Sequence, residues 1–159
     1  MGIWQSLWKF HEEIMREITV LGGFFFCGLI VLAFFALGFT SEALQLLVGF
    51  AIITALVVII RMVYFRERPK RVDHTNFIER IDASSFPSLH TARIVFVALF
   101  VGIAWPLVLW KVFLVFIALL VAYSRIYLRK HDWIDVVVGG GLGMVVFYVL
   151  KLIFFSRFG

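Results

Sequence analysis

The chain is poor in charge and in cysteine, and each shortage excludes a class of protein. Only 16% of its 159 residues are charged, whereas 63% are hydrophobic and the mean hydropathy is +1.03. A water-soluble domain of this length could not bury so much apolar surface. Disorder is excluded too, because the chain is apolar and holds 19 Phe, 5 Trp and 4 Tyr. The composition predicts a membrane protein with several spans and a single domain, residues 1–159.

The single cysteine, Cys27, lies in an apolar run and can form neither an internal disulfide nor a paired metal or redox site. The net charge is +5, from 15 Lys and Arg against 10 Asp and Glu. These positive residues lie between apolar runs instead of along one soluble face. Anionic lipid or phosphate is therefore favoured as a partner over nucleic acid.

The apolar runs predict an all-α, polytopic membrane helix bundle. About five transmembrane spans are expected, over residues 20–40, 43–65, 87–105, 107–123 and 133–155. Residues 1–18 precede them and carry an apolar stripe of helical spacing with Trp4 and Trp8 as anchors. We expect this segment to form an amphipathic helix in the membrane interface.

Polar residues gather in two connections, 66–86 and 124–132, which must lie outside the hydrocarbon layer. Alternation of the five spans places both connections and the N-terminal helix on one side of the membrane. The turns near residues 40 and 106 and the C-terminus fall on the other side. Any chemistry is therefore expected at one face.

Two arginines, Arg61 and Arg68, stand seven residues apart at the end of the second span. If the helix runs on to about Phe65 and beyond, both guanidinium groups leave the same face at the membrane surface. A pair of planar guanidinium groups suits a phosphate. The alternative is a pair of cations that extend to the interface without binding anything.

Pro87 is placed to begin a helix, so the backbone N–H groups of Ser88 and its neighbours would point out of the helix N-terminus as an anion site. Ser88 adds a hydroxyl, and His90 can exchange a proton near neutral pH. Taken singly, Ser88 is more often a cap and His90 a structural side chain.

His131 and Asp135 are spaced i, i+4 at the start of the last span. A carboxylate so placed can hold one imidazole N–H and leave the other nitrogen with a free lone pair. The alternative is a helix-start Asp beside an interfacial His. Because an ionisable residue inside a membrane helix is costly, the position of Asp135 favours a functional role for this pair over the alternative.

Together the three segments resemble the signature of the type 2 phosphatidic acid phosphatase superfamily: Lys-x6-Arg-Pro, Pro-Ser-Gly-His and Ser-Arg-x5-His-x3-Asp, in that order. Here they are Arg-x6-Arg-Pro at 61–69, Pro-Ser-Leu-His at 87–90 and Ser-Arg-x5-His-x3-Asp at 124–135. The likeness extends to residues 18–22 and to 136–139, so it covers most of the chain.

The resemblance implies a metal-independent lipid phosphate phosphatase without a cofactor. His131 would be the nucleophile that takes the phosphoryl group, Asp135 would orient it, and His90 would protonate the leaving oxygen. Water would then release phosphate from the phosphohistidine. The residues that would hold the equatorial phosphate oxygens are Arg61, Arg68, Ser88, the Leu89 N–H and Arg125.

The chain departs from the family pattern in three ways. Arg61 stands where Lys is usual, which keeps the charge and changes the hydrogen-bond geometry. Leu89 replaces the usual Gly, so a bulky side chain must fit beside the substrate. Many relatives have six spans, whereas five are expected here with the amphipathic helix in place of the first. The site is then expected to be more open sideways to lipid.

The expected substrate is a phosphomonoester or pyrophosphate on a membrane lipid, namely lipid A 1-phosphate, undecaprenyl pyrophosphate, phosphatidylglycerol phosphate or phosphatidate. An open side favours a bulky envelope lipid. The alternatives are a lipid phosphotransferase that uses the same site and a non-catalytic lipid-phosphate binding or transport protein. The His131–Asp135 pair argues against the non-catalytic alternative.

The distribution of positive charge bears on which side the site faces. The proposed catalytic side carries 12 of the 15 Lys and Arg residues and the other side carries 3. The positive-inside rule would place the catalytic side in the cytoplasm. Three of the 12, however, form the expected phosphate clamp, namely Arg61, Arg68 and Arg125. Many bacterial relatives also act on the outer face of the inner membrane. We therefore expect a bacterial inner-membrane protein with a periplasmic catalytic face.

Overall fold

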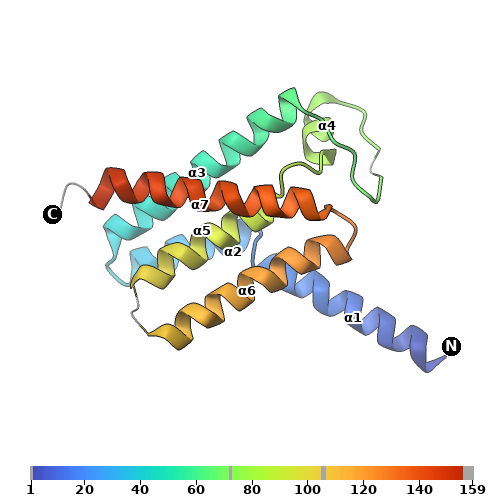
Figure 1. Ribbon diagram of the computed structural model, residues 1–159, viewed down its shortest axis with the longest axis horizontal. Coiled ribbons are helices and arrows are strands. Elements are labelled where there is room, and N and C mark those ends of the chain that lie inside the picture. Colours follow the sequence, from blue (N-terminus) through green and yellow to red (C-terminus); the bar gives the residue numbers. More distant parts are fainter. Residues whose placement is uncertain (1, 72, 105–106, 156–159) are drawn as a thin grey trace.

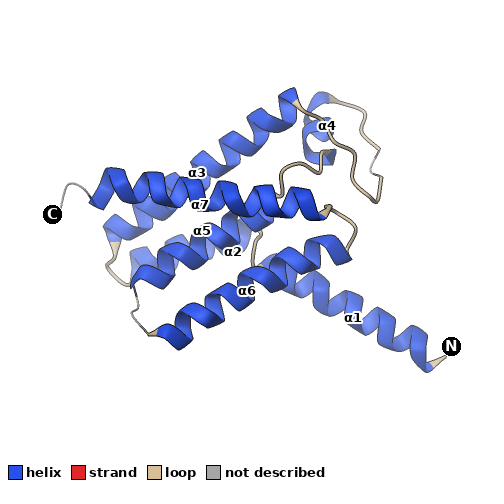
Figure 2. Ribbon diagram, viewed as in Figure 1, coloured by secondary structure: helices blue, strands red, loops and turns tan. Residues whose placement is uncertain are grey.

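The computed structural model describes residues 2–104 except residue 72, and residues 107–155. Within these residues every regular element is a helix (Figure 2). The helices are α1 (Ile3–Val20), α2 (Phe24–Ala36), α3 (Thr40–Val63), α4 (Phe77–Ala83), α5 (Leu89–Ala104), α6 (Val108–Tyr127) and α7 (Trp133–Phe155). The structure confirms the predicted fold class, an all-α membrane helix bundle.

The helices divide the bundle into a polar end and an apolar end. One end carries α4, the loops around it and the α6–α7 connection, and α1 extends from the same end (Figure 1). The opposite end carries the α2–α3 turn and the last described turn of α7. The sequence-based placement of the polar connections at a single face therefore agrees with the structure.

Three helices of the described residues, α3, α6 and α7, are each long and apolar enough to cross a membrane, and the bent pair of α1 and α2 would make a fourth span. The apolar helix α5 has 16 residues, or about 24 Å at the rise of an α-helix. The helix α2, within the expected span 20–40, has 13 residues. Both α2 and α5 are therefore shorter than the spans that the sequence predicts. The interfacial position of α1 stays a prediction.

The continuous helix expected over residues 20–40 is wrong, because the chain bends by 44° between α1 and α2. Leu21, Gly22 and Gly23 donate their N–H groups to carbonyls three residues back, which tightens the turn. Gly22 also lies directly on α5: a Cβ there would come within 2.8 Å of the His90 carbonyl oxygen. The glycine pair therefore allows both the bend and this close approach.

Three other expected boundaries need correction. Helix α3 ends at Val63 and the backbone of Tyr64 is extended, so the predicted common helical face for Arg61 and Arg68 is wrong. Helix α5 begins at Leu89, two residues after Pro87. Helix α6 continues to Tyr127 and so contains part of the expected 124–132 turn. The expected turn at 105–106 lies outside the described residues.

The short helix α4 was expected to be loop, although its sequence contains a start signal. The Asn76 side chain accepts a hydrogen bond of 2.9 Å from the Glu79 N–H, and the Glu79 carboxylate accepts one of 2.7 Å from the Thr75 N–H. This reciprocal pattern is that of a capping box shifted by one residue.

The core forms where α5 packs against α3 and α7. Phe96 of α5 is fully buried, with Phe50 of α3 and Phe147 of α7 at ring-centroid distances of 5.6 Å and 6.5 Å. Glycines bring the helix backbones together: a Cβ on Gly139 would lie 2.4 Å from the Ser88 carbonyl oxygen, and one on Gly143 would lie 2.3 Å from the Ala92 carbonyl oxygen. Gly139 and Gly143 stand four residues apart on α7, and this spacing of small residues allows the close approach.

This packing makes a testable distinction between two glycines of α7. Gly143→Ala should lower the free energy of unfolding by about 1–3 kcal/mol, since the new methyl group meets backbone that cannot move aside. Gly141→Ala is the matched control, because a Cβ there has no neighbour within 4 Å, and it should leave stability unchanged or raise it by up to about 1 kcal/mol. Unfolding in mixed micelles measures both, and equal stabilities would contradict the packing.

Candidate active site

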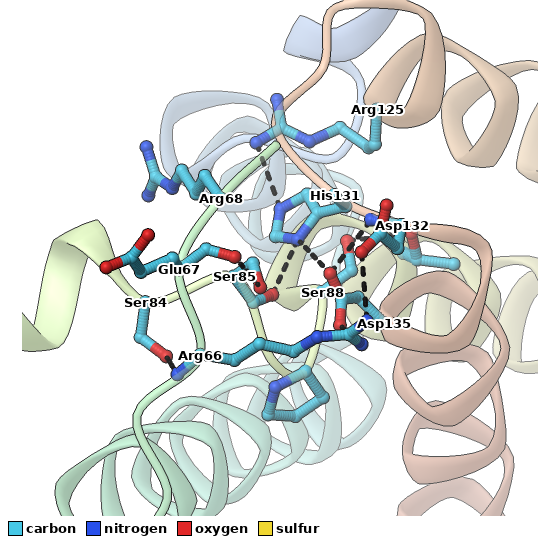
Figure 3. Close-up of polar contacts among 12 residues, drawn as sticks. Arg66, Glu67, Arg68, Ser84, Ser85, Ser88, Arg125, His131, Asp132 and Asp135 are labelled. Carbon is cyan, nitrogen blue, oxygen red and sulfur yellow. Dashed lines mark hydrogen bonds and ion pairs between the residues drawn. The ribbon is translucent and has the colours of Figure 1, made fainter. Parts of the chain in front are cut away.

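The predicted site residues converge at the polar end of the bundle. They come from the last turn of α3, the loop after it, the start of α5, the end of α6 and the connection into α7 (Figures 1 and 3). His131 lies in that last connection and is buried, with 2% of its surface exposed.

The two ring nitrogens of His131 have different partners (Figure 3). Nδ1 lies 2.6 Å from the backbone carbonyl oxygen of Ser85, and Nε2 lies 3.4 Å from Nη2 of Arg125. Because a carbonyl can only accept, Nδ1 carries the proton and donates it to Ser85. Nε2 is then left with its lone pair, which is the form a nucleophile needs.

Charge and burial keep this imidazole neutral. Burial, followed by the charge of Arg125, lowers the pKa of His131 to about 2. The charges of Arg61 and Arg68 act in the same direction, while the hydrogen bond to Ser85 opposes them. The ring is therefore unprotonated at physiological pH.

Asp135 does not make the contact that the sequence predicts. Its carboxylate lies 3.8 Å from Nδ1 of His131, beyond hydrogen-bonding distance, and the Ser85 carbonyl takes its place. Asp135 is fully buried and pairs with Arg66 at 2.7 Å. It also accepts a hydrogen bond of 2.9 Å from the backbone N–H of Asp132.

Arg66, which the sequence analysis did not select, links the parts of the site. Its guanidinium group bonds Asp135 at 2.7 Å and Asp132 at 2.9 Å, and its backbone carbonyl accepts from the Ser85 N–H at 2.8 Å (Figure 3). Arg66 thus holds both the segment that carries the acceptor for His131 and two carboxylates that follow that histidine in the sequence. Nothing in its spacing distinguishes it from the other cations of the 66–86 connection.

The three predicted clamp arginines approach the site from different elements. Arg61, on α3, donates to the carbonyls of Ile81 at 3.3 Å and Pro87 at 3.1 Å. Arg125, on α6, donates to Thr19 Oγ1 at 2.8 Å. Arg68 lies in the loop after α3, where it contacts the backbone carbonyl of Asp82.

This arginine cluster has unmet hydrogen-bonding capacity. Arg61 and Arg125 are 8% and 4% exposed, and neither forms an ion pair within the described part of the chain. The Nε–H groups of Arg61, Arg68 and Arg125 are buried without an acceptor, as is that of Arg93 on α5. Buried charges without a partner are costly, so the cluster is suited to an anionic ligand.

The start of α5 differs from the anion site that the sequence predicts there. The Ser88 N–H is not free but donates to the backbone carbonyl of Asp135 at 2.9 Å, and the Ser88 hydroxyl lies 2.9 Å from that of Thr91. Ser88 therefore joins α5 to α7. The Leu89 side chain packs against the core cluster, which removes the expected crowding beside the substrate. The side chain of His90, in the first turn of α5, makes no hydrogen bond within the described residues.

Comparison with known proteins now identifies the family. The PAP2 superfamily model matches residues 42–158. The chain belongs to the PAP2 superfamily. Membership makes it a lipid phosphatase, an enzyme that hydrolyses phosphate esters, as the sequence predicts.

Two solved structures resemble most of the chain. A transmembrane PAP2-type phosphatidylglycerolphosphate phosphatase from Bacillus subtilis is 26% identical with a TM-score of 0.73, over 95% of this chain and 77% of that one. LpxE from Aquifex aeolicus is 22% identical with a TM-score of 0.74, over 89% of this chain and 85% of that one. The second likeness supports the PAP2 fold alone. No curated protein sequence matches the chain.

The protonation state of His131 can be tested directly. Imidazole ¹⁵N chemical shifts in micelles should show His131 neutral and protonated on Nδ1 throughout pH 4–8. Arg125→Gln should raise the pKa of His131, because it removes the largest charge that lowers it. Arg80→Gln is the control, since Arg80 stacks on Phe65 and is not among the charges that act on His131. A His131 pKa near 6.5 in the unmodified protein would contradict the assignment.

Proposed function

We propose that this PAP2 protein hydrolyses a phosphomonoester or pyrophosphate on a membrane lipid through a phosphohistidine at His131. One observation carries the proposal: a neutral buried imidazole keeps the lone pair of Nε2 beside Arg125, within a cluster of guanidinium groups whose buried Nε–H groups lack acceptors. Such an arrangement combines a nucleophile with charge stabilisation for a transferring phosphoryl group.

In the proposed first step, the substrate phosphate binds between Arg61, Arg68 and Arg125 and receives Nε–H hydrogen bonds. The Nε2 lone pair of His131 attacks phosphorus while the bond to the leaving oxygen breaks. His90 gives a proton to that oxygen, the role that the family resemblance implies for it. The ring becomes positively charged, and the Ser85 carbonyl stabilises its Nδ1–H.

In the second step, water gives a proton to His90 and attacks the phosphohistidine, and the N–P bond breaks, which releases inorganic phosphate and returns the Nε2 lone pair to His131. Ser88 and Leu89 contribute differently from the expectation. Ser88 fixes Asp135 through its backbone, whereas the Leu89 N–H makes no hydrogen bond within the described residues and remains available to a phosphate oxygen. Asp135 acts with Arg66 to position the loop that holds His131.

The candidate substrates remain phosphatidylglycerol phosphate, phosphatidate, undecaprenyl pyrophosphate and lipid A 1-phosphate. The likeness to a phosphatidylglycerolphosphate phosphatase supports the first of these. The apolar helices keep the lipid chains in the bilayer while the phosphate reaches the polar end. We place the protein in a bacterial inner membrane with its polar end on the periplasmic side.

The nucleophile is tested by phosphate release from a lipid panel in the presence of a metal chelator. His131→Ala should lower turnover at least ~1000-fold, the size of loss seen when a catalytic nucleophile is removed. His74→Ala is the control, because His74 is an exposed loop histidine stacked near Phe65 and should keep full activity. Turnover retained in His131→Ala, or phosphate found on an acceptor instead of in solution, would contradict the hydrolytic assignment.

The positioning role of Arg66 gives a second test. Arg66→Gln should lower kcat by about 10- to 100-fold with a smaller change in KM, because a displaced nucleophile slows the chemical step more than binding. Arg66→Lys should recover part of the loss through one retained ion pair. The control is Arg71→Gln, whose exposed guanidinium pairs with Glu67 at 3.1 Å and with no other carboxylate among the residues that the structure describes. Equal kinetics for the Arg66 and Arg71 variants would refute the role.

A further inference from the structure

Positive charge continues beyond the clamp into a neighbouring pocket. The pocket has a volume of about 450 Å³ and lies between α1, the loop after α3 and the α6–α7 connection. Its charged lining residues are Glu12, Arg16, Arg68, Lys70 and Lys130. Only Arg68 belongs to the predicted clamp, so the pocket is a distinct feature of this end of the molecule.

We propose that this pocket binds a second anionic group in the substrate headgroup, so that the enzyme favours lipids with two phosphates over lipids with one. The proposal rests on the proposed function, because it places the scissile phosphate at His131. The second group is a phosphate on the leaving-group side in either of two settings, the inner half of a pyrophosphate or a phosphodiester one linker away.

The pocket is continuous with the reacting nitrogen. Thr19 lines the pocket, and its hydroxyl accepts a hydrogen bond of 2.8 Å from Arg125 Nη1. The other terminal nitrogen of Arg125 lies 3.4 Å from His131 Nε2. A single guanidinium group thus separates the pocket from the nucleophile, so one headgroup can contact both.

The charge of the lining is unbalanced. The Glu12 carboxylate is already paired with Arg16 at 2.7 Å, and within the described residues neither Lys70 nor Lys130 forms an ion pair. Burial, followed by the charges of Arg125 and Arg68, lowers the pKa of Lys130, as expected where positive groups crowd together. A second phosphate would relieve this repulsion.

Backbone hydrogen bonds hold both lysines in place. The Lys70 N–H donates to the Arg129 carbonyl at 2.9 Å, and Arg129 adopts a φ of 53° that turns the chain there. The Lys130 N–H donates to the Arg125 carbonyl at 3.1 Å, and the same carbonyl accepts from the His131 N–H at 3.2 Å. The backbone of Lys130 is therefore held by the same carbonyl that holds the backbone of His131. This shared acceptor keeps the pocket beside the proposed nucleophile.

The test compares three lipids with identical acyl chains and the purified full chain in mixed micelles. Phosphatidate has one phosphate, diacylglycerol pyrophosphate has a second one adjacent, and phosphatidylglycerol phosphate has a second one beyond a glycerol. The double variant Lys70→Gln with Lys130→Gln removes the two unpaired charges. Lys9→Gln, an exposed charge on α1 outside the pocket lining, is the control.

We expect the kcat/KM ratio of at least one two-phosphate lipid to phosphatidate to fall about 10-fold in the double variant, mainly through KM. The lipid whose ratio falls identifies the setting of the second phosphate. An unchanged ratio for both lipids, or an equal fall in the Lys9 control, would overturn the proposal. The proposed function fails separately, if His131→Ala keeps its activity or no lipid is hydrolysed.

Discussion

Two buried guanidinium groups, those of Arg61 and Arg125, lie near His131 without a carboxylate partner in the described part of the chain. Each charge has been removed from water and is satisfied only partly, by backbone carbonyls or by Thr19. In a medium of low polarity such charges are stabilised strongly by an anion. The same charges add to burial in lowering the pKa of His131 and so help to keep its imidazole neutral. In the proposed reaction, substrate binding and the neutral state of the nucleophile therefore depend on the same arginines.

Much of the fold follows from hydropathy and glycine spacing, but the helix ends do not. The spacing of Gly139 and Gly143 indicates close packing against some helix, because small residues repeated at helical spacing let backbones approach, and the structure shows that the partner is α5 with the residue before it. The end of α3 at Val63 could not be found this way, since residues 61–68 carry no proline or glycine before Pro69. That end is set by tertiary contacts, such as the one that ties the following loop to Ser85.

The site shows the same division between what spacing can and cannot reveal. The i, i+4 spacing predicts that His131 and Asp135 lie close together, and the structure places them 3.8 Å apart, although His131 precedes the first turn of α7. The acceptor for the imidazole is nevertheless the backbone of Ser85, and a carbonyl has no signature in a sequence. Arg66 was missed for a related reason: its contacts with Asp135 and Asp132 join segments 66 or more residues apart. Side-chain motifs therefore identified residues that the structure brings together, while the loop pairing that orients them required coordinates.

The pairing of Asp135 with Arg66 determines when the His131 ring becomes positively charged in the proposed reaction. A carboxylate bonded directly to His131 would favour the charged ring and would protonate it before the substrate arrived. With Asp135 neutralised by Arg66 and a neutral carbonyl on Nδ1, the ring gains its positive charge only as the N–P bond forms. The charge that stabilises it at that moment is the phosphoryl group's own, held by the arginines. The anion thus cancels the repulsion that kept the ring neutral, so the nucleophile is stabilised in its charged form only when a phosphate is bound.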